Sequence, residues 1–210
     1  VIRSVKTGAV LAAGNYNETN TIVFAKWLLS IAQEFTNILF LIERRSTGTA
    51  IMDYLIDMMP GVGLNPFKVI FNWVVEEHEL YPDRFETIDR PLHKIDPKLF
   101  VTYRKHFGYA TGGSGKAARD NLYGSTLLSA IKYTGNVTHD RALVDQISGL
   151  TTRNGRIDHA VGEKDDLCIA WMLGYWWLIN TKNSKYYGIE SRYILMSVVN
   201  SEIKNIDGKV

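Results

Sequence analysis

The clearest indication of a fold class lies in ILFLIERRSTGTAIMDYLI, residues 38–56. Its first part, residues 38–42, is an apolar run of strand length, which is typical of a central strand covered on both faces. After a short polar loop, helical spacing extends over residues 49–59 until a Pro-Gly pair stops it. A second strand is predicted over residues 67–75. Strand, helix and strand of these lengths form a βαβ unit, so the sequence predicts an α/β fold.

The N-terminal segment predicts a hairpin followed by a helix. Residues 1–14, VIRSVKTGAVLAAG, divide into two short strands around a Lys-Thr-Gly turn. Apolar residues at helical spacing over 22–35 predict a helix, which Asn20 or Thr21 can cap. Because the chain begins with Val1 inside the hairpin, we expect it to be a fragment of a longer protein.

The C-terminal half predicts mainly helices. Residues 76–97 are polar and irregular, and helical spacing then returns over residues 116–133, 139–150 and 165–180. An Asn-Gly pair within residues 151–159 predicts a hairpin turn. We therefore expect one domain over residues 1–180 and a C-terminal tail over residues 181–210.

The composition fits a globular protein of the cell interior. Hydrophobic residues make up 46% of the chain and charged residues 22%, which excludes wholesale disorder. The net charge of +2 neither requires nor excludes a nucleic-acid partner. Cys168 is the only cysteine, which excludes an intrachain disulfide and a cysteine zinc cluster. We find no signal peptide and no apolar run of bilayer length, so we expect no membrane partner.

Three carboxylates interrupt the apolar pattern where a charge is costly. Glu43 follows the most hydrophobic predicted strand, and Asp165 and Asp166 open the most hydrophobic predicted helix. A carboxylate near a core is unfavourable unless a cation neutralises it, and carboxylates brought together repel one another. Oxygen-rich sites suit Mg²⁺ or Mn²⁺. The pattern therefore indicates a metal site formed by these three residues.

The same residues have a purely structural interpretation. An aspartate in the first turn of a helix is favoured by the helix dipole and by capping. Glu43 can pair with Arg44 or Arg45, or it can face solvent. Only one of the two neighbouring aspartates is needed as a cap, but the pattern by itself leaves both interpretations open.

Other chemistries find no support in the sequence. The loop TGGSGKAA (111–118) fails as a Walker A motif because Ala110 and Ala117 replace the first glycine and the hydroxyl residue. Lys116 and Arg119 can still contact a DNA phosphate. The five histidines lack zinc-site spacing, and no Gly-x-Ser-x-Gly elbow occurs.

Three segments follow one another in a specific order. ILFLIERRSTGTAIMDYLI (38–56) is an apolar strand that ends in a carboxylate, followed by a glycine-containing loop and a helix. GYATGGSGKAARDNL (108–122) is a G-aromatic-x-T loop with a cation opening a helix, and EKDDLCIAWMLG (163–174) is an Asp-Asp-Leu element that starts an apolar helix. Together they cover about residues 22–180. In this order they resemble the nuclease domain of the tailed-bacteriophage DNA-packaging terminase large subunit, a ribonuclease H-like family, although Lys164 replaces a common histidine.

The resemblance implies a ribonuclease H-like mixed β-sheet flanked by helices on both faces. It implies an endonuclease that cuts double-stranded viral DNA during genome packaging. Glu43 and either Asp165 or Asp166 would be catalytic residues and metal ligands. Two ions, Mg²⁺ or Mn²⁺, would activate a water molecule and stabilise the leaving oxygen.

The resemblance also implies partners and a location. Arg44, Lys116 and Arg119 would contact double-stranded DNA. In the full-length protein, the partners would be an ATPase domain, the portal and the small terminase subunit. The location would be the host-cell cytoplasm. The failed Walker A motif agrees with the absence of the motor from this chain. The family's first catalytic aspartate lies on a strand before the hairpin, where this sequence has no residues, and Glu18 is a poor substitute. We therefore expect a gap in the sheet.

Three other identities remain open at this stage. Another ribonuclease H-like nuclease, such as a resolvase or a transposase core, would share the carboxylates and would differ in its activity on branched DNA. A non-catalytic DNA- or portal-binding module would bind without cutting. An unrelated α/β domain would hold Glu43 far from Asp165 and Asp166.

Overall fold

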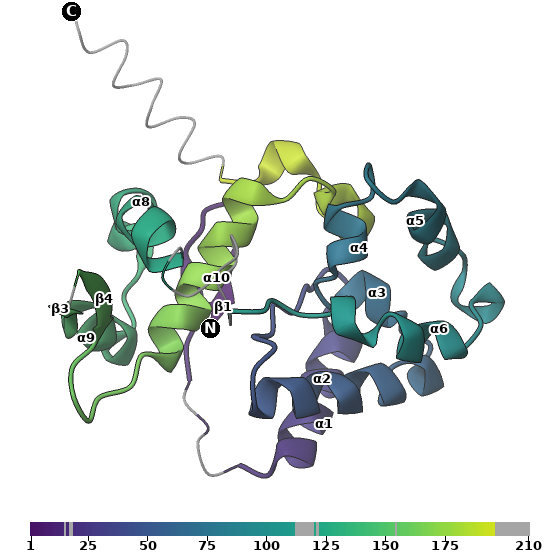
Figure 1. Cartoon of the computed structure of the whole chain (residues 1–210), viewed down its shortest axis with the longest axis horizontal. Coiled ribbons are helices and arrows are strands. Elements are labelled where there is room, and N and C mark those ends of the chain that lie inside the picture. The colour runs from purple at the N-terminus through teal and green to yellow at the C-terminus, as the bar shows by residue number, and fades with distance from the viewer. Residues whose placement is uncertain (15, 17–18, 112–119, 121, 154, 196–210) are drawn as a thin grey trace, which may run out of the picture. The chain divides into compact units, whose positions relative to one another are not determined.

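The computed structural model shows a chain of mixed α/β structure (Figure 1), which confirms the predicted α/β class. Helices dominate, and the strands form two small antiparallel sheets of two strands each in the part of the chain that is described. The description covers residues 1–14, 16, 19–111, 120, 122–153 and 155–195.

The chain divides into two compact units. The first unit comprises Val1–Asn15, Gly113–Asn180 and Glu190–Val210. The second unit comprises Tyr16–Gly112 and Thr181–Ile189. The fragment after residue 180 that we expected to be a tail therefore contributes its first part to the second unit.

Buried Glu76 holds that C-terminal fragment in the second unit. Its carboxylate accepts hydrogen bonds from the backbone N–H of Lys182 at 2.9 Å and from the hydroxyl of Thr181 at 3.2 Å. Close by, the hydroxyl of Tyr187 accepts a hydrogen bond from the backbone N–H of Asn72 at 3.2 Å. These bonds satisfy a buried carboxylate that would otherwise be costly.

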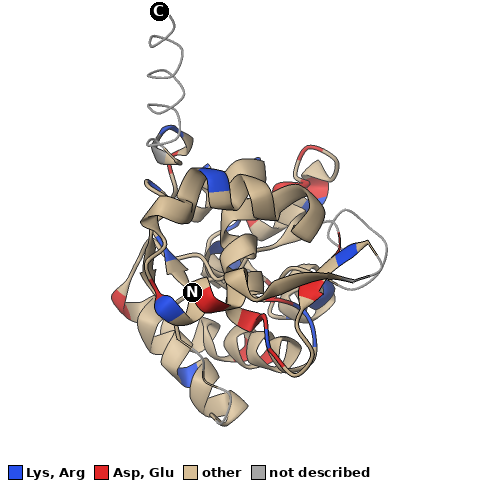
Figure 2. Ribbon diagram, turned by 90° about the vertical axis from the view of Figure 1, so that its left-hand side faces the viewer, with Lys and Arg blue, Asp and Glu red and all other residues tan. Residues whose placement is uncertain are grey.

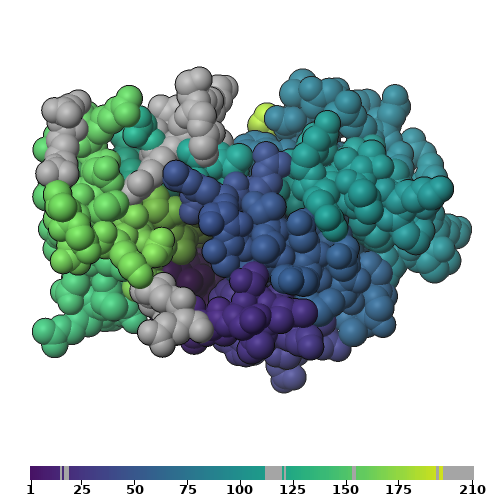
Figure 3. All heavy atoms as spheres, turned by 60° about the horizontal axis from the view of Figure 1, so that its bottom comes forward, coloured from purple at the N-terminus to yellow at the C-terminus, as the bar shows by residue number. Residues whose placement is uncertain are grey.

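The second unit is largely helical. Its α-helices are α1 (Thr21–Glu34), α2 (Thr47–Met58), α3 (Pro66–Val69), α4 (Trp73–Glu76), α5 (Pro82–Ile88) and α6 (Lys98–Thr102). Its 3-10 turns are η1 (Pro60–Val62), η2 (Leu92–Lys94), η3 (Arg104–His106) and η6 (Ser184–Tyr187). Helices α1 and α2 pack together, as Figure 3 shows for the purple and blue atoms, and buried Ala25 of α1 permits this close approach.

The predicted strand at residues 38–42 is extended but makes only isolated bridges. Phe40 pairs in parallel with Ile70, and Glu43 pairs in parallel with Tyr109. Asn72 pairs antiparallel with Phe107, so three chain segments meet. The described residues form no mixed sheet covered by helices on both faces, in contrast to the architecture that we expected.

The predicted strand at residues 67–75 is wrong. Two asparagines turn this apolar stretch into short helices, because the side chain of Asn65 accepts the N–H of Phe67 at 3.0 Å and that of Asn72 accepts the N–H of Val74 at 2.8 Å. Pro66 occupies the first helical position, which favours helix α3. Between the two helices, Ile70 and Asn72 are extended and each forms an isolated bridge.

The first unit combines two hairpins with a buried helix. Its strands are β1 (Ile2–Arg3), β2 (Val10–Ala12), β3 (Leu150–Arg153) and β4 (Arg156–His159). Its helices and turns are η4 (Leu122–Thr126, a π-helical turn), α8 (Leu127–Thr134), η5 (Gly135–Val137), α9 (Arg141–Ser148), α10 (Asp166–Asn180) and η7 (Ser191–Tyr193). Both hairpins lie where the sequence predicts them.

Figure 2 shows acidic and basic residues interspersed along the ribbon, in line with the small net charge.

A partly buried arginine, Arg3, joins the N-terminal hairpin to helix α10. The guanidinium of Arg3 donates to the carbonyl oxygen of Trp171 at 2.8 Å, to that of Gly8 at 2.7 Å and to the hydroxyl of Thr134 at 2.8 Å. Burial lowers the pKa of Arg3 to about 10, so the side chain is still charged at neutral pH.

Among the described residues, no helix combines the length and the hydropathy that crossing a bilayer requires.

Candidate functional site

Glu43 ends the extended segment. Its neighbours Ile42 and Arg44 form backbone hydrogen bonds with Tyr109, which hold the chain on both sides of Glu43. The N–H of Tyr109 donates to the carbonyl oxygen of Ile42 at 2.8 Å, and the N–H of Arg44 donates to the carbonyl oxygen of Tyr109 at 2.8 Å. The buried hydroxyl of Thr111 donates to Oε1 of the half-buried Glu43 side chain. The carboxylate therefore has a defined orientation while part of it remains accessible.

Two glycines allow the backbones around Glu43 to approach closely. A Cβ atom at Gly48 would lie 2.0 Å from the carbonyl oxygen of Glu43. Gly108 has a φ of +74°, and a Cβ atom there would lie 2.8 Å from the carbonyl oxygen of Ile42. Both glycines belong to the motifs that carry the family resemblance, and both are explained here by local packing.

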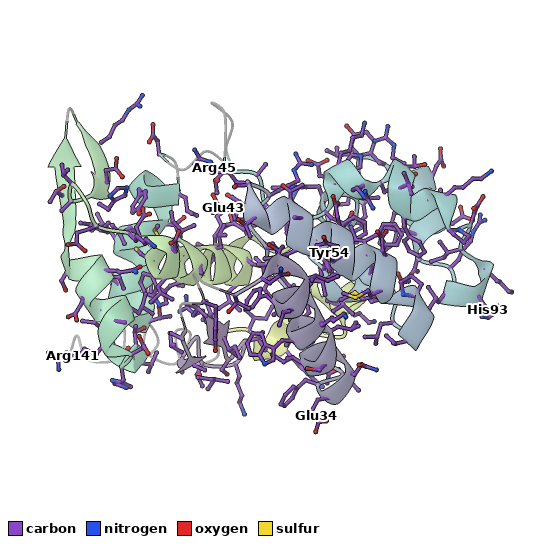
Figure 4. The ribbon with its side chains drawn as sticks, turned by 90° about the horizontal axis from the view of Figure 1, so that it is seen from below. Glu34, Glu43, Arg45, Tyr54, His93 and Arg141 are labelled. Atoms are coloured by element: carbon purple, nitrogen blue, oxygen red, sulfur yellow. The ribbon has the colours of Figure 1, made fainter. Side chains whose placement is uncertain are left out.

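The turn after Glu43 brings basic side chains to the start of α2. Ser46 adopts a φ of 47°, an uncommon value for a residue with a side chain. Figure 4 shows Glu43 and Arg45 at the same end of α2, with Tyr54 farther along the helix. Within the described residues, Glu43 forms no ion pair with Arg44 or Arg45, so the alternative interpretation of Glu43 as their salt-bridge partner has no support.

Asp165 and Asp166 differ in environment although they are neighbours. Asp165 is only 8% exposed, and its Oδ2 accepts a hydrogen bond from the hydroxyl of Tyr123. Asp166 is exposed and lies in the first turn of α10. The side-chain oxygen of Gln146 accepts the N–H of Leu167 at 2.9 Å and that of Cys168 at 3.2 Å, and thus caps the helix. A capping partner for α10 therefore exists apart from the two aspartates.

Each of the two candidate carboxylates, Glu43 and Asp165, accepts a hydrogen bond from a hydroxyl group. Thr111 serves Glu43 within the second unit, and Tyr123 serves Asp165 within the first unit. Lys116 and Arg119, the predicted DNA contacts, lie outside the described residues. The threonine of the G-aromatic-x-T loop was visible in the sequence, but no local signal marked Tyr123 or Gln146 as partners of the aspartate region.

The donor chemistry fits a hard divalent cation in part. Carboxylate and hydroxyl oxygens are ligands that suit Mg²⁺ or Mn²⁺. Glu43 belongs to the second unit and Asp165 to the first. Among the described residues, no group of three or more histidine, cysteine, aspartate or glutamate side chains is arranged to hold a metal ion.

Comparisons with known proteins found no match to this chain among family models, curated proteins or solved structures.

Proposed function

We propose that this chain is the metal-dependent, ribonuclease H-like DNA endonuclease domain of a phage DNA-packaging terminase large subunit. The observation that carries the proposal is the pairing of Glu43 with Tyr109 and Thr111. This pairing joins two segments, far apart in the sequence, that resemble the same family. The buried carboxylate of Asp165, at the start of the most apolar helix, is the second support.

The roles of the protein groups follow from their surroundings. Thr111 and Tyr123 donate hydrogen bonds that orient the carboxylates of Glu43 and Asp165. Asp165 is proposed as the principal helix-borne ligand because it is buried and oriented, whereas exposed Asp166 has an auxiliary role. Divalent ions, when bound, would supply an activated water molecule and charge stabilisation at the phosphodiester.

Plasmid cleavage in Mg²⁺ and in Mn²⁺ tests the proposal. We expect Glu43→Gln and Asp165→Asn each to abolish cleavage, and Asp166→Asn to reduce it less. Glu163→Gln is the matched control, because Glu163 is an exposed acid near the same helix start. The double variant should be no worse than either single variant if both carboxylates act in one reaction.

The assay also separates the competing functions. Cleavage that survives Glu43→Gln and Asp165→Asn rules out the proposed catalytic residues. Binding of linear duplex without any cleavage, in either metal, favours a non-catalytic DNA-binding module. Preferential cutting of a four-way junction over linear duplex favours a resolvase-type enzyme over a packaging nuclease.

A further inference from the structure

An open cavity in the second unit lies beside the segment that carries Glu43. It has a volume of about 470 Å³ and is bounded by helix α2 and by the stretch from Val101 to Lys105. Its lining includes three cationic side chains, Arg44, Arg104 and Lys105, and one carboxylate, Asp53. Because Arg44 follows Glu43 directly, the cavity and the candidate catalytic carboxylate share one turn of chain.

The cations of the cavity are of two kinds. Arg104 is held by two carboxylates of α2, with its Nε 3.1 Å from Oδ1 of Asp53 and a terminal nitrogen 3.1 Å from Oδ1 of Asp57. Within the described residues, neither Arg44 nor Lys105 forms an ion pair. The carboxylate in the lining is therefore engaged by Arg104, and two cations are left for an external anion.

The pKa of the neighbouring His106 is affected by two cations of the cavity, Arg44 and Lys105. Burial lowers the pKa of His106, and the positive charges of Lys105, Arg84 and Arg44 lower it further. The three cations come from three separate chain segments and act on the same imidazole. Since His106 stays neutral at pH 7, it can donate or accept a hydrogen bond there without adding charge.

The remaining lining indicates a ligand larger than a free anion. Met52 and Val101 contribute apolar surface, and Thr49 and Thr102 contribute hydroxyl groups. Cavities of about 300–1,000 Å³ hold ligands of drug size. A nucleotide unit combines a phosphate, which needs cations, with a sugar, which packs against apolar side chains.

We propose that this cavity binds a backbone phosphate and its sugar from the DNA substrate, with Arg44 and Lys105 as the cations that contact the phosphate. The inference rests on the proposed nuclease function and names the residues that would hold the strand next to Glu43. Arg104 then acts as a positioning residue, because its carboxylate partners on α2 fix the wall of the cavity.

Equilibrium binding of a short fluorescein-labelled duplex to the full chain, without divalent metal, tests this proposal. We expect Lys105→Gln and Arg44→Gln each to weaken binding several-fold, equally for unrelated sequences. Each should also reduce the slope of log affinity against log salt by about 0.9, the contribution of one phosphate contact to B-DNA. Lys94→Gln is the matched control, because Lys94 is an exposed lysine of the 3-10 turn η2 that does not line the cavity.

Two results would overturn the proposal. One is wild-type affinity and salt slope in both cavity variants. The other is equal weakening by the Lys94→Gln control. An acidic peptide that binds through Lys105 while the duplex does not would likewise replace the proposal with a protein-docking site.

Imidazole NMR gives an independent readout of the same cavity. Lys105→Gln should raise the pKa of His106 in the free protein, and duplex DNA should raise it in the wild type. A pKa of His106 that does not respond to duplex DNA would count against phosphate binding in this cavity.

The cleavage and binding assays separate the two proposals. If Glu43→Gln retains cleavage but Lys105→Gln weakens binding, the catalytic role of Glu43 fails and the phosphate site stands. If the wild type cuts no DNA in either metal but Lys105→Gln weakens binding, the nuclease assignment fails and the phosphate site stands. If Glu43→Gln abolishes cleavage but Lys105→Gln binds normally, only the phosphate site fails.

Discussion

Glu43 and Asp165 are held in place by different means. Glu43 ends an extended segment whose position rests on backbone bridges and on two close glycines, and its side chain is half-buried. Asp165 is buried at the start of α10, where side chains from distant elements, Tyr123 and Gln146, satisfy the carboxylate and the helix end. Because the backbone holds Glu43, we expect its position to tolerate substitutions of nearby side chains but not a Cβ atom added at a close glycine. Because side chains hold Asp165, we expect its region to be destabilised by the loss of a single polar atom.

The largest effect is expected for Gly48→Ala. The new Cβ atom would lie 2.0 Å from the carbonyl oxygen of Glu43, a backbone atom that can move only with its whole segment. We expect a loss of about 3 kcal/mol in the free energy of unfolding, measured in urea. Gly61→Ala is the control, because a Cβ atom there meets nothing within 4 Å. Equal stability of the two variants would show that backbone packing does not hold Glu43.

The next effect compares the two hydroxyl partners. Tyr123→Phe leaves a buried carboxylate short of a donor, so we expect a loss of about 2 kcal/mol in the free energy of unfolding. Thr111→Val should cost about half as much, because water can reach the half-buried Glu43 and replace the lost bond. Urea unfolding of both variants measures the difference, and a larger loss for Thr111→Val would reverse the comparison.

A smaller effect is expected for the cap of α10. Gln146→Ala removes the acceptor for the N–H groups of Leu167 and Cys168, and should lower the free energy of unfolding by about 1 kcal/mol. Gln33→Ala, at an exposed position of α1, is the control and should leave stability nearly unchanged. Stability that is unaltered by Gln146→Ala would mean that Asp165 or Asp166 caps the helix after all.

The smallest effect concerns pH. The pKa of His106 in the folded chain lies below its ordinary value of 6.5, so near pH 6 the unfolded chain binds more protons. The contribution of His106 to the free energy of unfolding is therefore fully present above pH 6.5. It is lost as the pH falls from 6.5 through the lower pKa of the folded chain. We expect His106→Asn to flatten the pH dependence of urea unfolding between pH 5 and 7, with His93→Asn as an exposed control. An unchanged pH profile would contradict the assigned environment.

Local sequence signals predicted much of the secondary structure. The N-terminal hairpin, helix α1 and its Asn20 cap lie where they were expected, because each depends on residues a few positions apart. The same kind of signal was overlooked at Asn65 and Asn72, whose side chains cap short helices inside an apolar stretch. Apolar character alone does not distinguish a buried strand from short buried helices.

The candidate site could be predicted only in its parts. The sequence marked Glu43, Asp165 and Asp166 as costly carboxylates, but it did not distinguish the two aspartates. Burial separates them, because Asp165 is 8% exposed and Asp166 is exposed. The cavity lined by Arg44 and Lys105 had no counterpart in the sequence, since its walls come from segments far apart in the chain.

The sequence by itself determined the residue types that can carry charge, the α/β class, and the caps and turns that depend on neighbours. Only the tertiary structure decided which hydroxyl meets which carboxylate: Thr111 lies 68 residues from Glu43, and Tyr123 lies 42 residues from Asp165. The physical reason is the distance along the chain over which each kind of interaction acts. Capping and periodicity act within a few residues, whereas satisfying a buried carboxylate depends on whichever distant segment the packing of the core brings beside it.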